Sequence, residues 1–94
     1  MKVIYPSKES LNRYFYYDEG DYEFPLVRKS NGERIGYSHQ KGARVFGKDR
    51  QTYYISRLVW IYFNGDAPNN KKILHKNKNK LDNRIDNLYV KGYS

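Results

Sequence analysis

The chain of 94 residues carries 18 lysine and arginine residues and 10 aspartate and glutamate residues, which gives it a formal net charge of +8. It contains no cysteine, so disulfide bonds and thiolate metal sites are excluded. No apolar run approaches the ~20 residues of a membrane-spanning helix, and no secretory signal follows the amino terminus, so we expect a cytoplasmic protein with no membrane partner.

The first part of the chain predicts two β-hairpins. Residues 26–29 and 34–37 flank Ser30-Asn31-Gly32-Glu33, and an Asn-Gly pair between extended runs favours a tight turn because both residues accept positive φ. Residues 44–46 and 51–55 are rich in β-branched and aromatic side chains and flank a second turn. We therefore expect a β-hairpin region over residues 1–54.

An amphipathic helix is predicted directly after the second hairpin. Four apolar residues fall at the i, i+3, i+4 and i+7 spacing of one helix face: Ile55, Leu58, Val59 and Tyr62. Ser56 is a suitable N-cap residue for this helix, and Asn64-Gly65 followed by Pro68 predicts its end.

The last part of the chain predicts a small hairpin with a short helix inside it. Ile73-Leu74 and Tyr89-Val90 suit its two strands, and Asp82 can cap a helix that runs through Leu88. We expect a single α+β domain over residues 1–94, in which the longer helix and this hairpin occupy residues 55–94.

The positive charge is concentrated in the second part of the chain. Residues 1–39 carry six basic and six acidic side chains, whereas residues 40–94 carry twelve basic and four acidic ones. Six basic side chains crowd into fourteen positions: Lys71, Lys72, Lys76, Lys78, Lys80 and Arg84. The amides of Asn77 and Asn79 lie among them and can bond to phosphate or base edges. Nucleic acid is the expected partner, and a plain solvated loop is the alternative.

A motif in this charged region resembles that of a known family. Residues 73–90 read I-L-H-K-N-K-N-K-L-D-N-R-I-D-N-L-Y-V, and they resemble the core of the phage-type HNH endonucleases, the ββα-metal nucleases. That core reads roughly I-D-H-I-N-G-D-K-x-D-N-R-I-E-N-L-R-V. The likeness extends to residues 55–60 and 64–68, with Ser56 at a position that is usually histidine, and it covers most of the chain from about Tyr14 onward.

The resemblance implies the roles of two residues. His75 takes the place of the family's general base, which removes a proton from water, and an imidazole can exchange a proton near neutral pH. Asn87 takes the place of the asparagine that holds the loop and helps to orient that base through hydrogen bonds. The alternative for His75 is contact with phosphate or packing within the hairpin.

The resemblance also implies a divalent cation, Mg²⁺ or Mn²⁺ in an active enzyme, but the ligand positions differ here. Leu74 stands where the family has a metal-binding aspartate or histidine, and leucine has no lone pair to offer. The second ligand belongs to a final helix after the second strand, where only Lys91-Gly92-Tyr93-Ser94 remain. Asp82 or Asp86 could substitute, although a helix cap and a favourable first-turn charge explain them. We therefore expect a truncated, degenerate ββα-metal motif with no cofactor.

Three functions are consistent with these observations. The first is a phage-type HNH-like protein that binds double-stranded DNA and has lost cleavage. The second is an active HNH nicking or homing endonuclease, which hydrolyses DNA phosphodiester bonds. The third is a phage protein of host takeover that inhibits a host nucleic-acid enzyme or defence protein, and the acidic residues 18–23 hint at such a surface.

Overall fold

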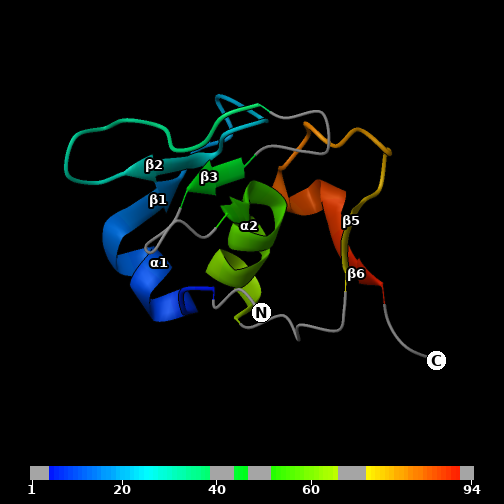
Figure 1. Ribbon diagram of the computed structural model, residues 1–94, viewed down its shortest axis with the longest axis horizontal. Helices are drawn as coiled ribbons and strands as arrows, with labels where there is room; N and C mark the ends of the chain where they lie inside the picture. The colour runs from blue at the N-terminus through cyan, green and yellow to red at the C-terminus, as the bar shows by residue number, and fades with distance from the viewer. Residues whose placement is uncertain (1–4, 39–43, 47–51, 66–71, 92–94) are drawn as a thin grey trace.

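The computed structural model describes residues 5–38, 44–46, 52–65 and 72–91 (Figure 1). In chain order its elements are α1 (Lys8–Tyr14), β1 (Phe15–Tyr17), β2 (Leu26–Arg28), β3 (Arg44–Phe46), β4 (Thr52–Tyr54), α2 (Ile55–Asn64), β5 (Lys72–His75), the 3₁₀ helix η2 (Ile85–Asn87) and β6 (Leu88–Lys91). The strands form three antiparallel pairs, β1 with β2, β3 with β4 and β5 with β6. The predicted α+β class is confirmed.

Helix α2 lies at the centre of the fold. It contacts α1 and β4 as well as β5 and η2, and Figure 1 shows it between the α1, β1 and β2 elements on one side and the β5–β6 pair on the other. Its buried apolar residues meet apolar side chains from the other elements in one core cluster: Leu11, Leu26, Ile35, Ile55, Leu58, Val59, Ile61 and Leu88. Burial of each such side chain contributes about 1.5–3 kcal/mol, so this cluster holds the β5–β6 pair against the rest of the chain.

The start of α2 differs from the prediction. The helix begins at Ile55, its N-cap residue is Tyr54, and no side chain caps it. Ser56 is therefore not the N-cap: it lies inside the helix and is buried. The reason is that β4 runs directly into α2, so the extended backbone of Tyr54 provides the cap geometry. The predicted end is confirmed, because the Gly65 N–H donates to the Ile61 carbonyl at 2.9 Å; Pro68 lies outside the described residues.

The first hairpin is only partly as predicted. The turn forms, since the Gly32 N–H donates to the Arg28 carbonyl at 2.8 Å and the Asn31 side chain accepts from the Glu33 N–H. The returning residues 34–37 form no strand, and Arg34 makes an isolated bridge to Val27. The strand partner of β2 is instead β1, whose Phe15 and Tyr17 pack against the core.

The second hairpin is confirmed. Strand β3 pairs with β4 in antiparallel register, with Val45 opposite Tyr53. Its turn residues, 47–50, lie outside the described residues. No helix in the described part of the chain is long and apolar enough to cross a membrane.

Substitution of Gly36 tests how closely the loop that follows β2 packs against its neighbours. Its φ is +118°, and a Cβ atom there would lie 2.8 Å from Phe24 Cδ1 and 3.1 Å from Ile55 Cδ1. We expect Gly36→Ala to lower the free energy of unfolding by about 3 kcal/mol, through backbone strain and the clash together. Urea denaturation measures this loss.

Gly32→Ala is the matched control. Its φ is +70°, and no atom lies within 4 Å of the added Cβ, so strain alone acts and a loss of about 1 kcal/mol is expected. Equal losses for the two variants would contradict the close approach of Phe24 to Gly36.

Candidate functional site

The β5–β6 hairpin places His75 and Leu74 on opposite faces. In the antiparallel register, His75 lies opposite Leu88 and Leu74 lies opposite Tyr89. Directly opposed residues share a face and successive residues alternate, so His75 shares the inner face with the buried Leu88. Leu74 lies on the outer face with Tyr89, which is 40% exposed.

The imidazole of His75 is held by Asn83. His75 Nε2 lies 2.9 Å from Asn83 Oδ1, while Asn83 Nδ2 donates to the Glu23 carbonyl at 3.0 Å. Because the amide nitrogen is occupied, Oδ1 faces the ring and can only accept, so Nε2 carries the proton. The lone pair of neutral His75 is therefore on Nδ1, the nitrogen that a general base would use.

Asn83 is the functional residue that the sequence analysis missed. It is fully buried at 0% exposure, and its own N–H donates to the Tyr22 carbonyl at 2.8 Å. Two of its partners are thus main-chain carbonyls of residues 22 and 23, about sixty positions away in the chain. The motif marked Asn83 as matching the family, but nothing local indicated which atoms it would bond.

Asn87 holds the loop rather than the imidazole itself. Its Oδ1 accepts from the Asn77 N–H at 3.1 Å, and its Nδ2 donates to Asn77 Oδ1 at 3.0 Å and to the Asp82 carbonyl at 2.8 Å. Its main-chain carbonyl accepts from the Lys76 N–H at 2.7 Å, directly after His75. Asn87 therefore fixes where the chain leaves β5, and the contact with the His75 ring comes from Asn83.

Asp82 is not the predicted helix cap. The 3₁₀ helix η2 starts after Arg84, and no side chain caps it. The buried Asp82 carboxylate instead accepts from Arg84 Nε at 2.8 Å, from Arg84 Nη2 at 2.7 Å and from Asn77 Nδ2 at 2.9 Å. These bonds from Arg84 lower the pKa of Asp82, and the carboxylate in turn raises the pKa of Arg84.

The segment from residue 76 to residue 84, here called the lysine loop, presents three exposed lysines: Lys76, Lys78 and Lys80. The asparagines between them bond to the loop's own backbone, since Asn77 Oδ1 accepts from the Asn79 N–H and Asn79 Oδ1 accepts from the Leu81 N–H. These are Asx turns, which explain the alternation of lysine and asparagine. The Asn77 oxygen accepts two bonds inside the loop, and its Nδ2 donates one bond to Asp82, so one N–H of this amide is left for an outside partner.

The other predicted contacts are distributed differently. Lys72 lies exposed on β5, Lys71 lies outside the described residues, and Arg84 is committed to Asp82. Lys78 has a φ of +63°, the left-handed region, at the position where the family motif has glycine. Lys78 thus has a backbone conformation that favours glycine.

The acidic residues 18–23 are engaged within the chain. Asp18 pairs with Arg34 at 3.1 Å, Asp21 accepts from the Glu23 and Phe24 N–H groups, Glu19 accepts from the Tyr17 hydroxyl, and Glu23 accepts from the Ser38 hydroxyl. Burial raises the pKa of Tyr17, whose oxygen also accepts from the Ile85 N–H at 2.9 Å. Through the Tyr22 and Glu23 carbonyls, residues 18–23, here called the acidic bracket, hold Asn83 in place, and the preceding Tyr17 holds η2.

Comparison with known proteins shows what this part of the chain is similar to. Residues 53–91 match the family model described as HNH endonuclease. A SPbeta prophage-derived protein of Bacillus subtilis (strain 168), YosQ, which is named as an HNH homing endonuclease, is 40% identical over 58 residues. Residues 53–91 of the chain are therefore similar to the HNH endonuclease family. The aligned stretch covers 62% of this chain but only 30% of the length of YosQ, and no solved structure matches.

HNH endonucleases use a metal ion, and the described side chains do not fit one. Leu74 offers no lone pair and lies on the face opposite His75. No group of three or more histidine, aspartate or glutamate residues within the described ranges could hold a metal ion. The Asp82 carboxylate is already bonded to Arg84, so it is not free to replace the missing ligand. Residues 92–94, where the resemblance places the continuation toward the final helix, lie outside the described residues.

The Asp82–Arg84 pair predicts a pH-dependent stability. Because the pKa of Asp82 is lower in the folded protein than its unfolded value of about 4, the pair's contribution is fully present above that value and is lost as the pH falls through the folded-state value. We expect Arg84→Gln to lower the free energy of unfolding at pH 7, and the difference from wild type to shrink below about pH 4. Urea denaturation between pH 7 and pH 2 measures it.

Lys76→Gln is the control, because it removes one positive charge from the same loop without breaking a side-chain bond of the described structure. A difference between Arg84→Gln and wild type that stays constant down to pH 2 would contradict the proposed role of the pair.

Proposed function

We propose that the chain binds double-stranded DNA through the lysine loop and does not cleave it. The similarity of residues 53–91 to the HNH endonuclease family supports a nucleic-acid partner. The three exposed lysines stand together on a loop that the Asn77, Asp82 and Asn87 bonds keep rigid, and this supports binding to successive phosphates. A preformed loop also loses less conformational entropy when DNA binds.

The observation that carries this proposal is the conformation of Lys78. A non-glycine residue in the left-handed region costs about 1–2 kcal/mol, and glycine would remove this strain. The side chain that is held there at this cost is an exposed cation with no bond to the side chains and backbone of the described residues. Backbone strain of this kind is common where a side chain serves binding rather than stability.

The replacement at Leu74 supports loss of cleavage. Leucine cannot bind a cation, and a hydrated metal ion beside it would lose favourable contacts with water. The bonds that shape the loop remain, so the family's scaffold is retained without its metal-binding side chain. The homing activity named for YosQ belongs to a protein of which this chain matches 30%, and it is not carried over.

Lys78→Gly separates binding from stability. It should leave the free energy of unfolding unchanged or raise it by up to about 1 kcal/mol, because strain is relieved while the unfolded chain gains entropy. It should also weaken binding to duplex DNA, since one phosphate contact is lost. If each of the three lysines neutralises one phosphate, the slope of log affinity against log salt is near −3, and this variant should reduce it by about one unit.

Fluorescence anisotropy of a labelled duplex over a salt series measures this slope, and urea denaturation measures the stability. Lys8→Ala, an exposed lysine on α1, is the matched control and should leave the slope unchanged. A flat salt response in the wild type would overturn DNA binding through this loop.

Cleavage is a second candidate function, favoured by the His75–Asn83 bond. That bond leaves Nδ1 of His75 with a lone pair suited to a general base. The test is nicking of a supercoiled plasmid with Mg²⁺ or Mn²⁺, beside a gel-shift on the same DNA, with wild type and His75→Ala. We expect a gel-shift without nicking. Nicking by the wild type that His75→Ala abolishes would instead establish an endonuclease.

A further inference from the structure

A cavity of about 540 Å³ lies where α1 runs into β1. Figure 1 places α1, β1 and β2 at one end of the long axis and the lysine loop, drawn in gold and orange, toward the other end. The cavity is lined by aromatic, basic and hydroxyl side chains: Arg13, Tyr14, Phe15, Arg28, Lys29 and Ser30. Among the residues that the structure describes, no acidic side chain lines it.

The two aromatic rings of the cavity differ in exposure. Phe15 is half-buried and packs against the core, while Tyr14, the last residue of α1, is 60% exposed. The Lys29 N–H donates to the Tyr14 carbonyl at 3.0 Å, which joins the end of the helix to the end of β2. The rings are thus held on rigid elements, and one of them stands free for stacking.

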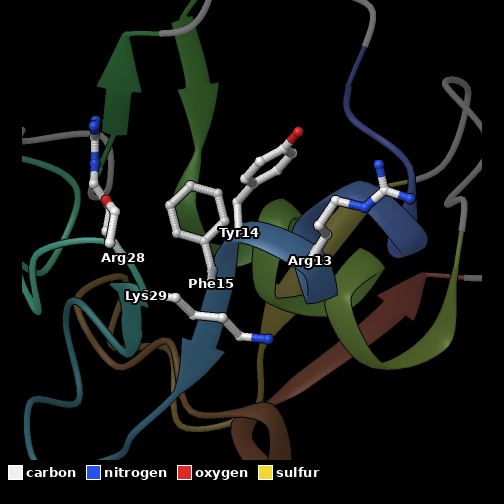
Figure 2. Close-up of a pocket in the computed structure, with 6 residues that line it drawn as sticks. Arg13, Tyr14, Phe15, Arg28 and Lys29 are labelled. Atoms are coloured by element: carbon white, nitrogen blue, oxygen red, sulfur yellow. The ribbon is translucent and has the colours of Figure 1, made fainter.

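The basic side chains of the cavity form no ion pair with an acidic side chain of the described ranges. The ion pairs found among the described residues involve neither Arg13 nor Arg28. Arg28 lies opposite Phe15 in the β1–β2 register, so the two side chains share a face. Lys29 Nζ donates to the Asn12 carbonyl at 2.7 Å and keeps two further N–H bonds to give. Figure 2 shows the Phe15 and Tyr14 rings between the guanidinium groups of Arg28 and Arg13.

Planar rings beside unpaired guanidinium groups match the chemistry of a nucleotide. A base stacks on an exposed aromatic ring, and a phosphate accepts paired bonds from arginine. The cavity volume falls within the usual range for small-molecule sites. Bases in a duplex offer only their edges, so a stacking wall requires an unpaired base.

We propose that this cavity binds one unpaired nucleotide of a single-stranded nucleic acid, with the base against Tyr14 and Phe15, and with the backbone phosphates on its two sides bound by Arg13 and by Arg28. This site is separate from the lysine loop and goes beyond duplex binding. A chain with both surfaces is suited to a junction at which duplex DNA continues into a single strand.

The test uses the full chain and a short fluorescein-labelled oligothymidine, measured by fluorescence anisotropy. Tyr14→Ala should weaken binding about tenfold through lost stacking, and Arg28→Gln should weaken it severalfold and reduce its salt dependence. The matched controls are Tyr22→Ala, a tyrosine 50% exposed outside the cavity, and Lys8→Gln, which removes one charge from α1 outside the cavity; both should bind as the wild type does.

Each outcome decides the proposal. Absence of binding by the wild type, or equal losses in the cavity variants and the controls, would overturn it. Thymidine monophosphate that competes as well as the oligonucleotide would overturn the assignment to a strand. Tyr14→Ala that weakens the oligonucleotide but not a duplex, beside Lys78→Gly that weakens the duplex but not the oligonucleotide, would establish two separate sites.

Discussion

The buried side-chain amide of Asn83 is the contact on which the candidate site depends. It accepts from His75 of β5, donates to the Glu23 carbonyl and lies in the lysine loop, so it joins three segments that are far apart in sequence. Breaking one of these buried bonds would leave a polar group without a partner, and the free-energy cost of that unpaired group is larger than the net stabilisation that the bond provides. The orientation of the His75 ring and the position of the acidic bracket are therefore coupled, because both depend on the same side-chain amide.

The parts of the fold that the sequence predicts well are those with a local signal. The apolar stripe of α2 and the alternating strands β3, β4, β5 and β6 depend on residues close together in the chain. Helix α1 has only seven residues and one buried side chain, Leu11, so it shows no periodicity to read. The pairing of β1 with β2 depends on which face reaches the core, and a turn motif such as Asn31-Gly32 cannot report this. Ser56 is not a cap because β4 runs directly into α2, and Asp82 is not a cap because its carboxylate is bonded to Arg84.

In the candidate site, too, the sequence predicted the features with a local signal and not the long-range contacts. The motif located His75 and Asn87 because their spacing is a property of the sequence. It did not reveal that the asparagine oxygens of the lysine loop bond to their own backbone, since the pattern of lysine and asparagine suggests binding amides and Asx turns equally well. The contact between Asn83 and the carbonyl of Glu23 spans 60 positions in sequence, and only the folded chain brings these groups together. Long-range polar contacts of this kind leave no periodic trace.

The free-energy cost of burying polar side chains in the lysine loop bears on the role of that loop. Asp82, Asn83 and Asn87 all lose contact with water, and buried ionic and polar groups of this kind rarely add stability over apolar residues of equal size. They do fix one conformation, which exposes three lysine side chains and holds Lys78 in a strained backbone. A rigid loop that presents several cations loses less conformational entropy when a polyanion binds, and this agrees with the proposed binding of phosphates.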